Sequence, residues 1–580
     1  MKFKTILERT VAAWIGMCTL LLLIRPIDLP VTKDSFSSIP IWAFFLCIIA
    51  AFIIMTLFHH FTKFKHADTW LFAASISLFL LLVAVRAEDI FTSSACVVLL
   101  VIVLFYIQRQ IPNDHIPTLS KKATTILVII ILAAIGCYVA WIGYMRYRIY
   151  ASPTYDYGIF NQMFYYMKET FTPLTTCERD GLLSHFAVHL SPIYYLLLPI
   201  YLLFPYGATL NIAQGFIISL SILPMFFLCR AKKLSRLTSL ILCLITALFP
   251  ALTGGTLYDI HENCFLLPLL LTLFCFYERR QLWPLYICSI LVLCVKEDAA
   301  IYLAFFAIYI LLDDRNMRKH GAILLALSIA WFMGASILLA AFGEGTMTDR
   351  YADYISEGGG LLSMVANLIR TPSLALQISF SFSEEKITFI LLMLLPLLFL
   401  PFVTKRMHRY ILICPMVLIN LMTPYLYQFD IGFQYVFGSG AFLLYAAILN
   451  LSDLSQLSRR RIIPLILGAT ILLFSAHIAA PNTFYFSYYA EQHQRIAVLD
   501  EALTKIPDHA SVTASSFLLP HLAQREELYD LDYTNKQTEW VAIELSNENN
   551  KNAAQTYQEN GYQTVYQVDD VICILQKTSS

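Results

Sequence analysis

Apolar runs long enough to cross a lipid bilayer recur along most of the chain. A spanning helix needs roughly 20 consecutive apolar residues. The 580 residues are 58% hydrophobic and only 14% charged, whereas soluble domains carry about 25% charged residues. We therefore predict an all-α polytopic membrane protein with fifteen spans, near 11–24, 40–58, 69–86, 90–108, 124–145, 209–229, 237–253, 263–277, 283–295, 299–312, 320–342, 387–403, 410–424, 435–450 and 462–480.

The net charge and the cysteines reduce the range of possible partners and sites. The net charge is zero, which gives no electrostatic reason to expect a nucleic-acid partner. The 13 cysteines lie mostly inside apolar runs without metal-ligand spacing, so we interpret them as small apolar residues. The basic N-terminus resembles a signal peptide but lacks a cleavage site, and we predict that it is an uncleaved first span.

Lys and Arg clusters predict the orientation, because such clusters stay on the cytoplasmic side. The apolar run SPIYYLLLPIYLLFP at 191–205 decides the topology. If it were a span, the later basic clusters would lie outside. If it lies in the outer interface, all eight clusters lie inside, and its prolines and short length favour this interpretation. The N-terminus is then cytoplasmic and the C-terminus extracytoplasmic, in a protein of the cell membrane.

A change of composition predicts where the domains begin. The tail is more polar, and the strand-like pieces SVTAS, WVAIEL and YQTVYQVDDVICIL alternate with the helical stretch EQHQRIAVLDEALTKI. We predict three parts. They are additional N-terminal helices at 1–120, a transmembrane core at 121–480 with a long outer loop at 146–208, and a small extracytoplasmic α/β domain at 481–580.

Ionisable residues gather in the predicted outer loops. Charges at membrane depth are costly, so such residues pair with one another or line a working cavity. The segments ASPTYDYGIFNQ, HFAVHLSP, YDIHEN, CVKEDAA and TPYLYQFDIGFQY carry Asp156, His185, His189, Asp259, His261, Glu262, Lys296, Glu297, Asp298 and Asp430. We therefore expect one polar site at the outer face.

Each of these motifs also has a purely structural interpretation. Asp156 can cap the following helix, and its tyrosine neighbours can belong to an interfacial aromatic belt. His185 and His189, four apart, share one face if they lie on a helix. They can bind a metal, contact a phosphate, or place their polar tips among lipid headgroups. The trio at 296–298 can be a self-neutralising cluster at two helix ends.

Several motifs together resemble a known family. YDYGIFNQ, HFAVHLSPIYYLLLPIYLLFP, IHEN and VKED occur in this order, and IPDHASVTASSFLLPHLAQREELYDL is similar to the family's closing segment. Over about 124–580 the chain resembles domain-of-unknown-function family 2079, polytopic membrane proteins related to the GT-C glycosyltransferase superfamily. The four N-terminal spans look like an addition to this unit.

The resemblance implies a membrane glycosyltransferase with a GT-C-like core. It would transfer a sugar from a polyprenyl-phosphate donor to a glycan or protein acceptor at the outer face. GT-C enzymes carry an essential acid in the first outer loop, which here is Asp156. The motif YDYG holds one acid where better-known members hold two, and this leaves open both the base and the use of a divalent cation.

The implied roles divide the outer residues into two groups. An acceptor hydroxyl needs a carboxylate to take its proton, and the departing phosphate needs a cation. The candidates for catalysis are Asp156, Glu262 and Glu297; those for substrate binding are Tyr155, Tyr157, His185, His189, His261, Lys296 and Asp298. Of these, the histidines and Lys296 would contact the lipid phosphate, and the two tyrosines would flank a sugar ring.

Two other classes of function compete with an enzyme. A transporter or lipid flippase would use charges along a pathway and often shows inverted repeats. No repeat is visible, and the polar residues gather at one face, which favours an enzyme. A non-catalytic scaffold for the cell envelope is the third interpretation.

Overall fold

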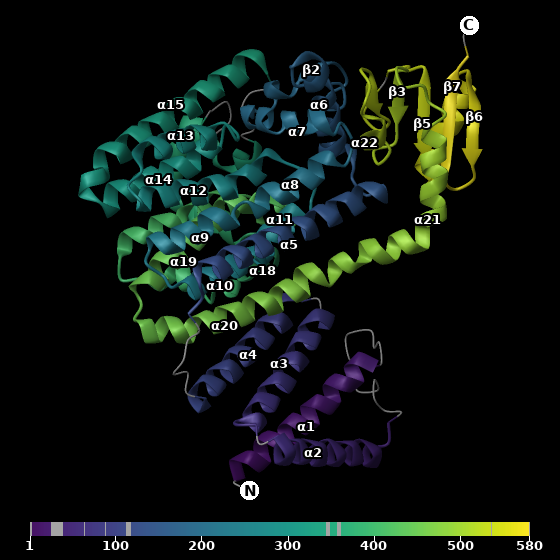
Figure 1. The fold of residues 1–580 in the computed structure, drawn as a ribbon. Coiled ribbons are helices and arrows are strands. Elements are labelled where there is room, and N and C mark those ends of the chain that lie inside the picture. Colours follow the sequence, from purple (N-terminus) through teal and green to yellow (C-terminus); the bar gives the residue numbers. More distant parts are fainter. Residues whose placement is uncertain are drawn as a thin grey trace.

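The computed structural model describes residues 3–24, 39–62, 64–87, 89–111, 118–343, 349–355, 361–534 and 536–578. Helices dominate, and a small sheet forms the C-terminal end (Figure 1). The N-terminal helices lie at the opposite end of the molecule from residues 146–208, the predicted outer loop (Figure 1). The predicted class, a helical membrane protein with a C-terminal region that contains strands, is confirmed.

The N-terminal helices pack through a buried ion pair. Arg9 donates from Nε to Oδ1 of Asp68 at 2.8 Å and from Nη1 to the hydroxyl of Thr56 at 2.6 Å. These contacts tie three helices together, whereas α4 packs against α20 of the core. The four helices are α1 (Phe3–Ile24), α2 (Ile41–Thr62), α3 (Ala67–Ala87) and α4 (Ile90–Gln110).

The core is a bundle in which many helices are short. Its first part holds α5 (Lys121–Arg148), α8 (Thr209–Ser219), α9 (Ile222–Ala231), α10 (Arg236–Ala247), α11 (Pro250–Thr256), α12 (Leu266–Glu278), α13 (Leu282–Leu293), α14 (Ala299–Asp313) and α15 (Arg318–Phe342). Its second part holds α16 (Leu361–Arg370), α17 (Pro372–Phe380), α18 (Ser383–Leu394), α19 (Val436–Asp453) and α20 (Gln456–Phe474).

Among the described residues, nine helices are long and apolar enough to cross a membrane, or ten if the bent pair α10 and α11 is one span. This is fewer than the fifteen spans predicted. Several predicted spans are short or broken helices: α10 and α11 meet at an angle of 46°, and Met407–Leu421 consists of 3-10 and π turns. Irregular backbone is tolerated at membrane depth where protein surrounds it, so apolar length overestimates the number of continuous helices.

As predicted, the run at 191–205 does not form a spanning helix. It contains a 3-10 turn at Pro192–Leu196 and then α7 (Leu198–Leu203), which has only six residues. At 1.5 Å per residue this helix is far shorter than a bilayer. The outer loop also holds α6 (Ile159–Thr170) and a two-stranded ribbon, β1 (Leu174–Thr175) and β2 (Leu183–Ser184), which pair antiparallel.

Helices α5 and α8 approach closely, and this contact supports the outer loop. A Cβ atom on Gly215 would lie 2.7 Å from the backbone nitrogen of Ala140. Small residues permit such approach between membrane helices. The same contact brings Asn211 of α8 to Asp259, whose Oδ1 accepts from its Nδ2 at 3.0 Å.

The tail contains strands and helices, as predicted. Its five-stranded sheet has the order β4-β3-β5-β7-β6, with β3 parallel to β4 and β5 and with β7 antiparallel to β5 and β6. The elements are α21 (Phe484–Leu503), β3 (Val512–Ala514), α22 (Leu519–Leu522), β4 (Leu528–Asp530), β5 (Trp540–Glu544), α23 (Glu548–Glu559), β6 (Tyr562–Val568) and β7 (Ile572–Lys577). The three strand-like pieces predicted from the sequence form strands, the last of them two strands, β6 and β7, whereas β4 was not predicted.

Side chains on both sides hold the tail against the end of α5. The guanidinium of Arg148 pairs with Asp500 at 2.9 Å. The ring of His521 stacks between those of Tyr147 and Tyr150, with centroids 4.0 and 3.9 Å away, and its Nε2 lies 3.1 Å from the carbonyl oxygen of Tyr147. The tail is therefore docked on the loop that follows α5.

This docking is expected to weaken in acid. Burial lowers the pKa of His521 to about 3, from its ordinary value of 6.5. The unfolded chain then binds a proton that the folded protein does not, so the free energy of unfolding falls as the pH drops from about 6.5 towards 3, by up to about 1.4 kcal/mol per pH unit. His521→Phe keeps the stacking and cannot titrate. Between pH 7 and 5, the melting temperature of this variant should fall less than that of the wild type. An equal fall would show that His521 does not cause the loss of stability in acid.

Candidate functional site

A cavity of about 610 Å³ lies where the outer loop meets four other segments of the core. These are the turn after α11, the turn between α13 and α14, the 3-10 segment between α15 and α16, and the segment before α19. Its walls consist of Asp156, Ile159, Phe160, Glu178, Arg179, His185, Val188, His189, Tyr258, His261, Glu262, Lys296, Arg350, Tyr425, Tyr427, Phe433, Gln434 and Tyr435. The structure thus brings six of the ten sequence-predicted site residues into one wall.

Asp156 lies on a π-helical turn, Thr154–Gly158, between α5 and α6. Between α5 and this turn, Tyr150 has a left-handed backbone, with a φ of 59°. Oδ2 of Asp156 accepts from the hydroxyl of Tyr258 at 2.8 Å, and Oδ1 lies 3.1 Å from Nε2 of His261. The side chain keeps 29% of its surface exposed. The carboxylate is therefore held in place but still reachable from the cavity.

His261 contacts acceptors through both ring nitrogens. Its Nδ1 lies 3.0 Å from the carbonyl oxygen of Asp259, and its Nε2 faces Asp156. A histidine donates from both nitrogens only when it is protonated. Burial lowers the pKa of His261, but the charges of Asp156 and Glu262 and the hydrogen bonds to Asp156 and Asp259 together outweigh burial, so the net pKa is raised. The geometry and the pKa both favour an imidazolium.

The same pairing keeps Asp156 ionised. Burial alone raises the pKa of this carboxyl. The charge of His261 and the hydrogen bonds from His261 and Tyr258 outweigh burial, so the pKa lies below its ordinary value. A carboxylate with a lowered pKa stays charged at neutral pH, as an acceptor of protons or cations must be.

Two further ion pairs connect the turns around the cavity. Oε1 of Glu262 lies 2.8 Å from Nζ of Lys296, and Oε2 accepts from the hydroxyl of Tyr194 at 2.8 Å. Glu297 pairs with Nδ1 of His189 at 3.0 Å and accepts from the backbone N–H of Leu190 at 3.1 Å. The trio at 296–298 is thus not a self-contained cluster, because two of its members pair with other loops.

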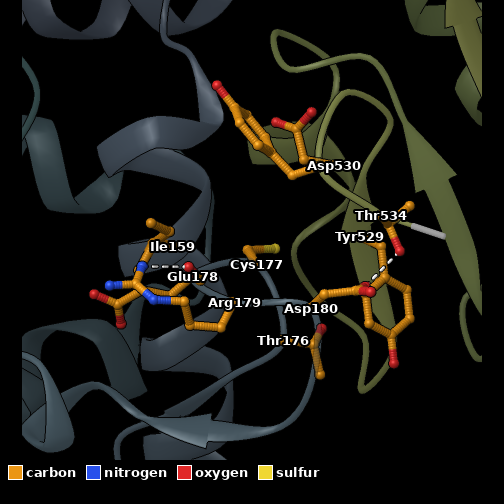
Figure 2. Close-up of a pocket in the computed structure, with 10 residues that line it drawn as sticks. Ile159, Thr176, Cys177, Glu178, Arg179, Asp180, Tyr529, Asp530 and Thr534 are labelled. Carbon is orange, nitrogen blue, oxygen red and sulfur yellow. Dashed lines mark hydrogen bonds between the residues drawn. The ribbon is translucent and has the colours of Figure 1, made fainter. Parts of the chain in front are cut away.

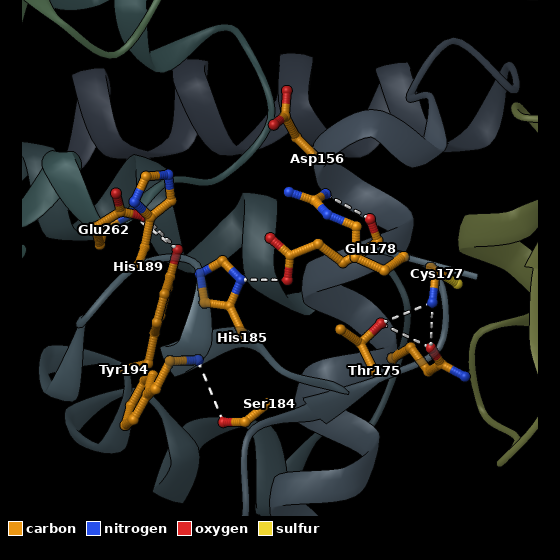
Figure 3. A network of polar contacts seen from close by, with 12 residues as sticks. Asp156, Thr175, Cys177, Glu178, Ser184, His185, His189, Tyr194 and Glu262 are labelled. Atoms are coloured by element: carbon orange, nitrogen blue, oxygen red, sulfur yellow. Dashed lines mark hydrogen bonds and ion pairs between the residues drawn. The ribbon is translucent and has the colours of Figure 1, made fainter. Parts of the chain in front are cut away.

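The pair of His185 and Glu178 was not foreseen from the sequence. Nδ1 of His185 lies 2.9 Å from Oε2 of Glu178, and within the described residues its buried Nε2 has no hydrogen-bond partner (Figure 3). His185 begins a 3-10 turn rather than an α-helix, yet both it and His189 line the cavity, with ring centroids 6.0 Å apart. Glu178 follows a cysteine in an irregular loop, where no periodic pattern could have identified it.

Arg350 is another residue of the cavity wall that the sequence analysis did not predict. Its guanidinium lies over the rings of Tyr425 and Tyr435, at 4.8 and 4.9 Å from their centroids. Such cation–π contacts hold a guanidinium in a fixed place without neutralising its charge. The residue adds a positive charge opposite the outer loop.

Other candidates lie away from the cavity wall. Tyr157 is fully buried, its hydroxyl donates to the carbonyl of Gly207, and its ring packs edge-on against Tyr147, so no face of it is open to a ligand. Asp298 precedes α14 and is not part of the wall. Glu297 is not part of the wall, although it pairs with His189, which is. The side chain of Tyr155 lies outside the described residues.

Asp259, which the sequence could not separate from Asp156, has a structural role. Its carboxylate is buried and accepts from the hydroxyl of Ser152 at 2.7 Å and from Arg146 at 3.2 Å. These partners fix the turn that carries His261. Asp430 is exposed and bonds the backbone N–H of Gly432 at 2.8 Å.

The use of a divalent cation stays an open question from the sequence. In the part of the chain that the structure describes, no group of three or more His, Cys, Asp or Glu side chains is arranged to hold a metal ion. The carboxylates of the cavity are paired instead with Lys, His and Tyr side chains.

Comparison with known proteins places the chain in a family. A family model described as predicted membrane protein, DUF2079, matches residues 146–573. The match includes the whole cavity wall and nearly all of the tail, and it leaves out α1 to α4 and most of α5. A search of curated proteins found no match. Since the family model covers most of the chain, the protein belongs to this family of predicted multi-pass membrane proteins.

Proposed function

We propose that the protein is a membrane glycosyltransferase, which transfers a sugar from a polyprenyl-phosphate donor to an acceptor at the outer face of the membrane. In this proposal residues 121–480 form a GT-C-like core and 481–580 an extracytoplasmic domain. The N-terminus lies in the cytoplasm of a cell-membrane protein, and residues 1–120 are an addition to the core.

The charge of the cavity supports an anionic donor. Three carboxylates, those of Asp156, Glu178 and Glu262, face three Lys and Arg side chains, and His261 adds a further positive charge. Lys296, which pairs with Glu262, and Arg350, which lies over two tyrosine rings, would place positive charge beside a phosphate as it leaves with negative charge. The tail of the lipid would lie against the apolar surface of the surrounding helices.

The single observation that carries the proposal is the position of Asp156. Its carboxylate is ionised and is oriented by Tyr258 and His261. It is partly exposed to a cavity whose wall also contains Lys and Arg side chains. A general base must lie within hydrogen-bond reach of the hydroxyl that it deprotonates. Asp156 meets this condition for an acceptor that enters the cavity.

The proposal is tested by transfer from labelled donors. Membranes from cells that express the protein, and from cells with an empty vector, receive a panel of polyprenyl phosphates that carry radiolabelled sugars. We expect a labelled product other than the donor lipid only where the protein is present. Movement of the labelled lipid between leaflets without product would establish a flippase instead, and neither effect across the panel would favour a scaffold.

A further inference from the structure

A second cavity, of about 390 Å³, lies between the outer loop and the tail (Figure 2). The outer loop lines one side and the segment around β4 the other. Its walls consist of Ile159, Thr176, Cys177, Glu178, Arg179, Asp180, Tyr529, Asp530, Tyr533 and Thr534. Ile159, Glu178 and Arg179 line the first cavity as well, so the two spaces adjoin.

Several hydrogen bonds join the two sides of this cavity. The hydroxyl of Thr176 donates to the carbonyl of Leu528 at 2.6 Å and accepts from its N–H at 3.1 Å. The amide of Gln162 donates to the carbonyl of Glu526 at 3.0 Å and accepts from the N–H of Thr176 at 2.7 Å. Asp180 accepts from the hydroxyl of Thr534 at 2.5 Å. The cavity therefore lies at a hydrogen-bonded junction between the loop and the tail.

The lining of the second cavity differs in charge from that of the first. It holds three carboxylates, those of Glu178, Asp180 and Asp530, and one cation, Arg179. Such a lining repels a phosphate. Carboxylates accept hydrogen bonds from hydroxyl groups, and the rings of Tyr529 and Tyr533 offer apolar faces beside a polar tip. An uncharged molecule rich in hydroxyl groups matches this combination.

We propose that the second cavity binds the acceptor as an uncharged saccharide, whose reacting hydroxyl extends past Glu178 towards Asp156. This inference rests on the proposed function. The acceptor oxygen forms a bond to the anomeric carbon of the donor sugar, and its proton passes to the Asp156 carboxylate. The bond from the anomeric carbon to the phosphate oxygen breaks, and the polyprenyl phosphate leaves with the electron pair. The tail domain thereby sets acceptor specificity, while the core holds the donor.

Saccharide binding can be measured without catalysis. The full-length protein is placed in lipid nanodiscs, because maltoside detergents would themselves offer a sugar. Methyl α-mannopyranoside, methyl β-glucopyranoside and methyl β-galactopyranoside then serve as probes in saturation-transfer NMR. We expect binding of at least one probe, weakened about tenfold or more by Tyr533→Ala, the scale on which loss of a contact tyrosine acts. Tyr533→Phe should retain binding.

Tyr489→Ala is the matched control, since Tyr489 is an exposed tyrosine on α21 outside the cavity lining. Comparable melting temperatures would exclude misfolding as the cause of a loss. Binding of no probe, or equal binding by Tyr533→Ala, would overturn the acceptor site even if the protein transfers sugar. Binding that depends on Tyr533 in a protein without transfer activity would support the saccharide site and reject the proposed function.

Discussion

Replacing Asp156 by asparagine is expected to lower the rate of glycosyl transfer by about 10²- to 10⁴-fold, the range that general acid–base catalysis contributes. Asparagine has nearly the same size and can still accept from Tyr258, but it cannot take the proton of an acceptor hydroxyl. It also removes the negative charge that raises the pKa of His261. The rate is measured in membranes with labelled donor, at equal protein level.

Asp430→Asn provides the control for this substitution. Asp430 also lies in a predicted outer loop, but its side chain is not part of the cavity wall. We expect this variant to transfer sugar at the wild-type rate. Equal rates for Asp156→Asn and the wild type would remove Asp156 as the base, and Glu178 and Glu262, the other carboxylates of the wall, would then be the candidates.

Replacing Lys296 by methionine is expected to destabilise the fold by about 3–5 kcal/mol, because it leaves the buried carboxylate of Glu262 without its cation. Both side chains are almost fully buried, at 5% and 1% exposure. Lys296 also holds the turn between α13 and α14 against the turn after α11. The loss is measured as a lower melting temperature of the purified protein.

A second substitution separates charge burial from lost packing. Glu262→Met together with Lys296→Met removes both charges at similar volume, and such replacements often restore stability. Lys232→Met is the control, because the pair of Lys232 and Glu278 is more exposed, and partly exposed pairs contribute about 1 kcal/mol or less. A single Lys296→Met variant as stable as the Lys232→Met variant would contradict the assigned role of the buried pair.

Local patterns in the sequence determined the class of protein and the strands of the tail. Apolar length is a property of one segment, and the bilayer imposes it without reference to other segments. The tail pieces WVAIEL and YQTVYQVDDVICIL predicted strands in the same way, from residue preferences within each piece. The outer loops with Asp156, His261 and Lys296 also stood out locally, because charges are rare beside apolar runs.

Only the tertiary structure decided which of these residues act together. Asp156 pairs with His261, whereas Asp259, in the same kind of turn, is buried with Arg146. His185 pairs with Glu178 and not with a lipid-facing partner. The pairs of Asp156 with His261 and of Asp259 with Arg146 depend on helix packing, whereas His185 and Glu178 meet within one loop. A charge that contacts residues a hundred positions away, as Asp156 and His261 do, carries no local signal of its partner.

The same reason explains the broken helices and the second cavity. A helix can end at membrane depth when neighbouring segments supply its missing hydrogen bonds, and the sequence of that helix does not reveal those neighbours. The junction of the outer loop with β4 joins residues 176–180 to residues 529–534, which meet only because α5 and α21 bring the tail against the loop. Segment length and composition thus determine which helices and strands form, and long-range packing determines where the functional side chains lie.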